Sequence, residues 1–440
     1  MRTRFPALIA TLALAFSALA WTIASGSQAH TSAGARAVSF APAGGVNVLN
    51  VGPLPVSQAD YAIAQAHALH AAIVRTEVPW SSLEPYRAGE LSSASLAFMD
   101  RLVNDANADG IRVIFSVDSS PCWASTAPAA LLKACRPGQI NRADGWPPTQ
   151  PQAYATFVGF LAQRYGTKLA AIEIWNEPDQ SNELYFAGPD KASRYAAVLR
   201  AAYRAIKLNN PQVTVLAGSI VGTSGAFLRT LYAAGIKGYY DGLAVHFYTL
   251  TLAGLRTIRE VQLANGDQKP IWLNEFGWSS CWPRYKIQQE QACVTQSVQA
   301  ANITNLYREL AHTPYVAAAV IYELQGSTQE DFGMLTARGT HKSAFSALAS
   351  VLSSPSGSPT RPTLGLHRHG SRIVASGSGP VGDYLRLEVR GHGLRYWVVL
   401  TLDRFNHYAV TLPSALGTSN LRAQIYQYWE GVARATRRSL

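Results

Sequence analysis

Short apolar runs recur along most of the chain and alternate with longer stretches of helical character. The runs are rich in β-branched residues and lack strict polar alternation, which is typical of parallel strands covered on both faces. They span residues 46–49, 72–75, 111–115, 171–175, 213–217, 242–246, 270–273 and 316–322. Alanine-rich stretches with helical spacing lie between them, for example at residues 58–71, 96–107, 151–165, 192–207 and 293–311, with a last one at 342–352. Eight strands alternating with helices predict an α/β fold, a closed (β/α)8 TIM barrel, with an open doubly wound sheet as the alternative.

The pattern changes after residue 352. Residues 353–359 contain only Ser, Pro and Gly, a composition typical of a linker. Beyond them, hydrophobic and polar positions alternate with period two in three runs, at residues 385–389, 396–400 and 424–428. This pattern predicts a small all-β, sandwich-like C-terminal module. The expected organisation is therefore a barrel over residues 41–352, a linker over 353–363 and a β module over 364–440.

The N-terminus has the form of a secretory signal. Arg2 and Arg4 precede an almost wholly apolar run over residues 5–20, small residues follow at Ser25, Gly26 and Ser27, and residues 27–29 suit a signal-peptidase site. A membrane anchor is the alternative, but the run is short for a span of about 20 residues. We therefore expect residues 1–29 to be removed, and the rest of the chain to be secreted and not bound to a membrane.

Four cysteines form two local pairs. Cys122 and Cys135 lie 13 residues apart, and Cys281 and Cys293 lie 12 apart. An even number suits an oxidising compartment, and a disulfide closing such a loop stabilises a fold by about 3 kcal/mol in the chain-entropy estimate. A zinc site would need closer cysteine spacing or accompanying histidines, so two disulfides are the favoured interpretation.

Composition narrows the function classes. Of the 440 residues, 48% are hydrophobic and 15% are charged, which supplies a large core and argues against disorder. The net charge of +11 is spread along the chain, with part of it near the C-terminus at Arg434, Arg437 and Arg438. No basic run is interleaved with aromatic residues, so the charge is interpreted as surface character and no nucleic-acid partner is expected. No metal or organic cofactor is implied, and a monomer is expected.

Two motifs end predicted strands with a glutamate. Asn176 and Glu177 lie at the end of the fourth strand, and Glu275 lies at the end of the seventh. In a parallel barrel, strand ends meet at one rim, where barrel enzymes carry out their chemistry. Two carboxyls on one rim are what glycosidic cleavage requires, since one protonates the leaving oxygen and the other attacks the anomeric carbon or activates water. A single glutamate there would more often be a solvated or paired residue.

These motifs resemble those of a large clan of retaining (β/α)8 glycoside hydrolases. The clan includes family-5 cellulases and mannanases and family-39 xylosidases, and the resemblance covers roughly residues 45 to 350. It rests on the Trp-Asn-Glu-Pro run that contains Glu177 and on the Glu-Phe-Gly-Trp run that begins at Glu275. The resemblance implies that Glu177 is the acid/base and Glu275 the nucleophile.

Further positions extend this resemblance to the neighbouring side chains. Arg75 on the second strand corresponds to the arginine that hydrogen-bonds the nucleophile. His246 and Tyr248 follow the sixth strand, where the clan places a sugar-binding histidine and a tyrosine bonded to the nucleophile. Asn176 would hold the sugar 2-hydroxyl. Without the motif, His246 would equally suit a buried core histidine.

Other residues are expected around the sugar. Glu173 shares the in–out phase of Glu177 on its strand, and we interpret it as a buried partner of Arg75. Tyr322 on the eighth strand stands where many clan members carry a tryptophan beneath the substrate, and Asn274 stands where a smaller residue is commoner. Predicted rim loops carry four tryptophans whose exposed faces could stack on a pyranose or simply pack: Trp80, Trp123, Trp278 and Trp282.

The expected activity is retaining hydrolysis of β-linked oligosaccharides or polysaccharides. Glu275 would attack while Glu177 stays protonated because of nearby negative charge, with the two carboxyls about 5–5.5 Å apart. A carbohydrate-binding protein that has lost turnover and a transglycosylase are the alternatives. The C-terminal module is either a sugar-binding domain or a spacer, and its aromatic residues either form a binding face or belong to its core: Tyr396, Trp397, Tyr426, Tyr428 and Trp429.

Overall fold

A computed structural model gives the fold of the chain. It describes residues 42–181, 183–248, 253–282, 293–327, 331–354, 361–379, 384–429 and 432–440. The predicted signal at residues 1–29 and the centre of the predicted linker lie outside the described residues. Within these ranges, no helix combines the length and the apolar character that crossing a membrane requires.

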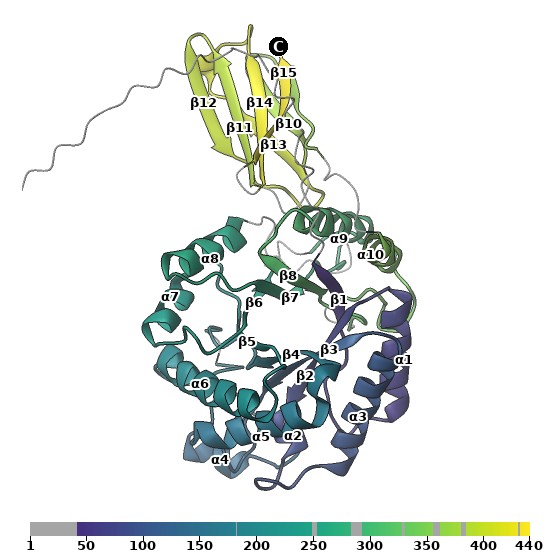
Figure 1. Cartoon of the computed structure of the whole chain (residues 1–440). Helices are drawn as coiled ribbons and strands as arrows, with labels where there is room; N and C mark the ends of the chain where they lie inside the picture. Colours follow the sequence, from purple (N-terminus) through teal and green to yellow (C-terminus); the bar gives the residue numbers. More distant parts are fainter. Residues whose placement is uncertain are drawn as a thin grey trace, which may run out of the picture. The chain divides into compact units, whose positions relative to one another are not determined.

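Eight parallel strands close into a barrel in sequence order, as Figure 1 shows. Strand β1 pairs with β8 as well as with β2, so the sheet has no free edge. The predicted closed barrel is confirmed, and the open doubly wound sheet is excluded because its first and last strands would not pair. The strands are β1 (Ala43–Asn47), β2 (Ile73–Pro79), β3 (Arg112–Asp118), β4 (Leu169–Ile174), β5 (Val215–Ile220), β6 (Gly242–Phe247), β7 (Ile271–Phe276) and β8 (Val316–Ile321).

Helices surround the barrel and bury apolar stripes against it (Figure 1). Local signals fix several of their starts. Ser92 and Thr295 accept hydrogen bonds from backbone N–H groups in the first turns of α3 and α9, and Pro151 occupies the first position of α5. The helices are α1 (Val56–Ala68), α2 (Trp80–Leu83), α3 (Ser93–Ala108), α4 (Ala129–Ala134), α5 (Pro151–Tyr165), α6 (Lys191–Asn209), α7 (Ala226–Ala233), α8 (Ala253–Ala264), α9 (Gln296–Leu310) and α10 (Ser343–Ser353).

The C-terminal part is all β, as predicted, and consists of two antiparallel sheets. One sheet has the order β13-β10-β9 and the other has the order β12-β11-β14-β15. Sequence alternation identified β11, β12 and β14, while the more polar β9, β10, β13 and β15 gave no strand signal. The strands are β9 (Gly365–His369), β10 (Arg372–Ser378), β11 (Tyr384–Gly391), β12 (Leu394–Val399), β13 (His407–Thr411), β14 (Arg422–Trp429) and β15 (Val432–Ser439).

Both predicted disulfides are present. Cys122 and Cys135 are bonded with their Cα atoms 5.8 Å apart, and Cys281 and Cys293 are bonded with theirs 5.4 Å apart. No free cysteine remains, so no thiolate is available for a zinc site. Each bridge ties down a loop that follows the carboxyl end of a barrel strand, the first after β3 and the second after β7.

Candidate active site

The inside of the barrel changes from apolar to polar along the strands. Ile73, Ile114 and Ala171 belong to a small apolar cluster that is separate from the main core. Two residues further along their strands stand Arg75, Ser116 and Glu173, and these three hydrogen-bond one another. Bonds between β2 and β4, which are not neighbours in the sheet, must cross the inside of the barrel. Because alternate residues of a strand face the same side, these side chains form an apolar layer and, above it, a polar layer below the carboxyl ends of the strands.

Arg75 is the centre of this polar layer and is 1% exposed. Its Nε and Nη2 donate to the two carboxylate oxygens of Glu173 at 2.9 and 3.0 Å, as predicted for this pair. Its Nη1 donates to Glu275 Oε1 at 2.6 Å, and Nη2 donates to Asn176 Oδ1 at 2.9 Å. A buried guanidinium bridging two carboxylates fixes their positions and compensates their charge.

Small polar side chains complete the layer around the buried carboxylate of Glu173. Ser116 Oγ donates to Glu173 Oε1 at 3.1 Å, and Asn274 Nδ2 donates to Glu173 Oε2. Asn47 receives a bond from Arg75 and donates to the backbone oxygen of Asn274 at 2.9 Å. The unusual Asn274 therefore has a structural reason, because its amide supports a carboxylate that no solvent reaches.

The chain leaves the regular strand conformation just before Glu177. Strand β4 ends at Ile174, and both Trp175 and Glu177 have positive φ values, 70° and 43°. Trp175 turns away into the core, where its Nε1 donates to the carbonyl of Tyr185. The strand phase expected to link Glu173 with Glu177 therefore stops at Ile174. Left-handed residues at a functional rim hold side chains in directions that a regular strand does not offer.

Glu177, His246 and Glu275 form a compact cluster at the rim. His246 Nδ1 lies 2.7 Å from Glu177 Oε1 and 3.3 Å from Glu275 Oε2. One side-chain nitrogen or oxygen atom from each of the three residues lies within 4.8 Å of the corresponding atoms of the other two. A register shift after Val245 brings His246 opposite Glu275. Tyr248 donates to the same oxygen, Glu275 Oε2, at 2.8 Å.

The charge balance of the cluster differs from the sequence expectation for Glu177. Burial raises the pKa of Glu177, but the hydrogen bonds and charges of His246, Gln180 and Arg75 outweigh it, so the pKa lies below its usual range. Burial lowers the pKa of His246, yet Glu275 and Glu177 together raise it above its usual range. This direction is opposite to the expected effect of neighbouring negative charge, because the histidine between the two carboxylates supplies a hydrogen bond and a charge that favour the ionised form of Glu177.

Three possible metal ligands meet in this cluster, but their spacing does not fit a cation. Ligands about 2.0–2.2 Å from a tetrahedral zinc ion would lie about 3.3 Å apart. His246 Nδ1 and Glu177 Oε1 are closer than that, at a hydrogen-bond distance of 2.7 Å. The Arg75 guanidinium, 2.6 Å from Glu275, also opposes a second cation. The geometry suits a shared proton.

A pocket of about 450 Å³ opens beside Glu275 at the carboxyl ends of β1, β2 and β8. Tyr322 lines it and packs edge-on against Phe332, with ring centroids 5.7 Å apart. Glu77, which sequence reasoning left without a role, also lines the pocket and accepts a hydrogen bond from Asn50 at 2.8 Å. Its position two residues after Arg75 was the available signal, because alternate residues of a strand share a face.

A second buried carboxyl, that of Asp118, affects the charge of Glu77. Burial and the nearby charge of Asp118 raise the pKa of Glu77 to about 8. Burial raises the pKa of Asp118 to about 6. Asn176 Nδ2 lies 3.4 Å from Glu77 Oε1, while its Oδ1 is bound to Arg75. Glu77 therefore adds a carboxyl to the pocket that Glu275 also lines, and it helps to orient the amide expected to hold a sugar hydroxyl.

Two of the tryptophans expected to stack on a sugar are buried. Trp80 is 0% exposed, packs between Trp123 and Phe157 and donates to Glu84 at 2.7 Å, so it presents no face to a sugar. Trp278 is 3% exposed and packs edge-on against Phe276. For these two residues the expectation of a sugar-stacking face is wrong, because the main core covers their rings. Trp123 is half-buried and donates to the carbonyl of Glu84.

Comparison with known families agrees with this site. Residues 154–345 match the family model described as glycosyl hydrolase catalytic core, a range that includes Glu177, His246 and Glu275. The matched range lies within the barrel, from α5 to the start of α10. The enzyme class predicted from the sequence, a glycosidase, is confirmed, as is the resemblance to barrel glycoside hydrolases. No curated protein matches the chain in sequence.

Solved structures of glycosidases share the fold of this chain. A GH39 β-xylosidase from Caulobacter crescentus is 17% identical, with a TM-score of 0.51 over 81% of this chain and 82% of its own. The endo-β-1,4-mannanase from Thermotoga petrophila is 13% identical, with a TM-score of 0.53 over 91% and 97%. A GH30 endoxylanase from Clostridium papyrosolvens is 13% identical, with a TM-score of 0.54 over 86% and 95%.

Proposed function

We propose that the chain is a secreted retaining glycosidase that cleaves β-glycosidic bonds with Glu275 as nucleophile and Glu177 as acid/base. The observation that carries the proposal is the short separation of the two carboxyls, whose nearest oxygens lie within 4.8 Å. Retaining enzymes hold their carboxyls about 5–5.5 Å apart, whereas inverting enzymes leave about 6.5–9.5 Å for a water molecule.

The surroundings of Glu275 suit a nucleophile. Arg75 and Tyr248 donate to its two oxygens, at 2.6 and 2.8 Å. The same two bonds hold the carboxylate in one orientation beside the pocket that it lines, so little further ordering is needed before attack. Attack on the anomeric carbon forms the glycosyl-enzyme and breaks the bond to the leaving oxygen.

The surroundings of Glu177 suit a group that must first give a proton and later take one back. The proton that it delivers to the leaving oxygen is held in its 2.7 Å hydrogen bond with His246. A substrate that excludes water weakens the charged form of this pair and favours transfer of the proton to the carboxylate. Once Glu275 is esterified, Glu177 accepts the proton of the attacking water, and the cycle closes.

Secretion and the substrate class complete the proposal. Two disulfides suit an oxidising compartment, and the signal-like N-terminus supplies the route. The structural neighbours include enzymes described as a β-xylosidase, an endo-β-1,4-mannanase and an endoxylanase, so aryl β-xylosides and aryl β-mannosides are the first substrates to test, with oligosaccharides after them.

Azide distinguishes the two carboxyls by the product that forms. Glu275→Ala should lower kcat by at least about 10³-fold, and added azide should restore turnover and give the α-glycosyl azide. Glu177→Ala should lower kcat by about 10²–10⁴-fold, and azide should then give the β-glycosyl azide from the glycosyl-enzyme. Glu260→Ala, at an exposed position of α8, is the matched control and should keep full activity.

The stereochemistry of the wild-type product tests the proposal directly. Proton NMR of a running reaction should show the β anomer first, before mutarotation. An α anomer as the first product would mean inversion and would overturn the assignment of Glu275. Sugar binding without product release on every substrate of the panel would instead identify a binding protein, and products longer than the substrate would identify a transglycosylase.

A further inference from the structure

The outer face of the four-stranded C-terminal sheet carries an unusual set of charges. Strand β11 buries Leu385, Leu387 and Val389, so the residues between them turn to the opposite side. Strand β14 buries Ala423 and Ile425 in the same way. The outward positions of the two strands are Arg386, Glu388 and Arg390 on β11, and Arg422, Gln424 and Tyr426 on β14.

Three arginines stand side by side across this face. Strand pairing sets Arg390 opposite Arg395 of β12 on one side and opposite Arg422 of β14 on the other. Side chains directly opposite each other on one sheet face lie about 4.5–5.5 Å apart at Cβ, and like charges in such pairs destabilise the sheet. A row of three cationic side chains therefore opposes the stability of the fold.

One acid on this face does not neutralise the row. Glu388 forms ion pairs with Arg395 and Arg386, at 2.9 and 2.7 Å, and is itself buried beneath them. Arg390 and Arg422 form no ion pair within the described parts of the chain, and neither does Arg437 of β15. Three exposed guanidinium groups with five N–H donors each are left to face solvent.

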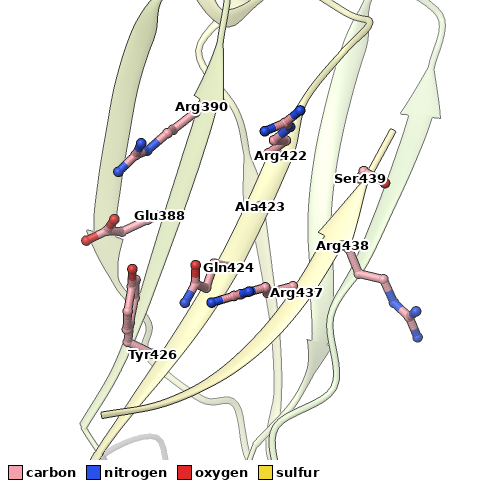
Figure 2. Close-up of a pocket in the computed structure, with 9 residues that line it drawn as sticks. All are labelled: Glu388, Arg390, Arg422, Ala423, Gln424, Tyr426, Arg437, Arg438 and Ser439. Atoms are coloured by element: carbon pink, nitrogen blue, oxygen red, sulfur yellow. The ribbon is translucent and has the colours of Figure 1, made fainter.

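These groups border a groove of about 490 Å³ along β11, β14 and β15, drawn in Figure 2. Pairing sets Arg437 opposite Gln424, and Figure 2 shows both beside Arg390, Arg422 and Glu388. Arg438 points away and donates to the carbonyl of Leu364 at 3.1 Å. Volumes of about 300–1,000 Å³ are typical of ligand sites, and an amide beside guanidinium groups provides both donors and an acceptor for hydroxyls.

An aromatic ring lies next to the arginine row. Trp397 of β12 pairs with Glu388 and is 58% exposed. Its exposed indole offers an apolar face on which a pyranose ring can stack. Tyr426 is less available, because the guanidinium of Arg386 lies over its ring at 5.2 Å. The face thus combines one stacking surface, unpaired cations and hydroxyl-binding groups.

We propose that this sheet face binds an acidic polysaccharide, with Arg390, Arg422 and Arg437 on its anionic groups and Trp397 on a sugar ring. Guanidinium groups form paired hydrogen bonds with carboxylates and with sulfates alike, so the shared chemistry is an anionic sugar. A nucleic acid is the less favoured partner, because stacked bases need several exposed aromatic side chains and the described part of this face offers Trp397 alone. The inference is independent of which bond the barrel cleaves.

Binding of the full chain to four polymers tests the proposal. Polygalacturonate and dextran sulfate represent carboxylated and sulfated sugars, neutral dextran represents the uncharged class, and single-stranded DNA represents a different polyanion. At low salt we expect binding to one of the two anionic polysaccharides, weaker binding to DNA, and none to dextran. The tighter of the first two identifies the anionic group, and raising the salt concentration should weaken binding because screening acts on exposed charges.

The double variant Arg390→Gln/Arg422→Gln should lose at least about tenfold in affinity. The control Arg338→Gln/Arg372→Gln removes the same charge from exposed positions elsewhere and should bind like the wild type. Trp397→Ala should weaken binding to the polysaccharide but not to DNA, which separates stacking on sugar from simple charge attraction. Equal losses in the charge-matched control, or DNA bound as tightly as both anionic polysaccharides, would overturn the proposal, provided that thermal unfolding shows each variant folded.

Discussion

Charged side chains gather in two regions, the barrel mouth and the outer sheet face of the C-terminal part, and they are treated in opposite ways. In the barrel, Arg75 is buried and contacts both Glu173 and Glu275. On the sheet, Arg390 is exposed and stands between two other arginines. The first region surrounds its buried arginine with carboxylates, whereas the second accumulates one sign.

Solvent explains the difference. A buried ion loses several kcal/mol of hydration and persists only where a partner of opposite sign replaces the water. An exposed guanidinium keeps its hydration, and its repulsion with neighbours is screened over about 8–10 Å in ordinary salt. The barrel can therefore hold a precise arrangement for chemistry, while the sheet can hold a surplus that an anionic ligand would neutralise.

Replacing one arginine in each region should give the largest difference in the free energy of unfolding. Arg75→Met leaves Glu173 and Glu275 buried without their cation, which should cost about 3–5 kcal/mol of unfolding free energy and abolish hydrolysis. Arg422→Met removes an exposed cation and should change the free energy by less than about 1 kcal/mol. Urea unfolding of both variants measures the difference. Equal losses would show that the buried network does not depend on Arg75.

Removing the charge between the two glutamates should move the pH dependence of the barrel reaction. His246→Phe deletes the cation that lowers the pKa of Glu177, so that pKa should rise. The acid form of Glu177 would then persist to higher pH, and the basic limb of the kcat/KM profile should shift upward by about 1 pH unit or more. Tyr239→Phe removes an aromatic hydroxyl that accepts from Arg204 and not from the cluster, and it should leave the limb in place. A limb that moved downward would contradict the assignment of Glu177 as the acid.

The pattern of hydrophobic positions alone predicted the barrel. The eight apolar runs correspond to β1 to β8 with ends displaced by a few residues, because strand length depends on pairing partners that a single run does not specify. The strands of the C-terminal part were harder to find. Arg368 and His369 of β9 and Arg437 and Arg438 of β15 lie on polar edge strands, whose pairing comes from backbone hydrogen bonds and not from an apolar pattern.

The candidate site was predictable where a motif or a strand phase described it. The sequence motif pointed to Glu177 and Glu275, and the structure brings them together. The alternation of strand β2 alone would have placed Glu77 in the site, on the same face as Arg75. The alternation of β4 does not predict the direction of Glu177, because Trp175 and Glu177 leave the extended conformation. Trp80 was misjudged because a loop position does not reveal that Trp123 and Phe157 cover the ring.

Glu77 links stability to pH within the barrel. Its pKa of about 8 in the folded state lies above the ordinary 4.5 of an unfolded chain. The folded state therefore keeps a proton that the unfolded state loses, and stability should fall as the pH rises from about 4.5 to 8, by up to about 1.4 kcal/mol per pH unit. Glu77→Gln should flatten the decline between pH 6 and 8, above the range in which Asp118 contributes. Thermal unfolding across this range measures the slope, and an unchanged slope would place the titration elsewhere.

The smallest effect is expected on the sheet, where relief of repulsion should stabilise the fold slightly. Arg422→Gln removes one of the cations facing Arg390 while keeping a side chain that can hydrogen-bond, so the free energy of unfolding should rise by about 0.2–1 kcal/mol at low salt. The gain should vanish near 1 M salt, because the Debye length there is about 3 Å, less than the spacing of the pair. Arg372→Gln, outside the row, should show no such salt-dependent gain. A loss of stability in Arg422→Gln would mean that Arg422 makes a net stabilising interaction in the folded chain. The surplus of charge would then need no ligand to explain it.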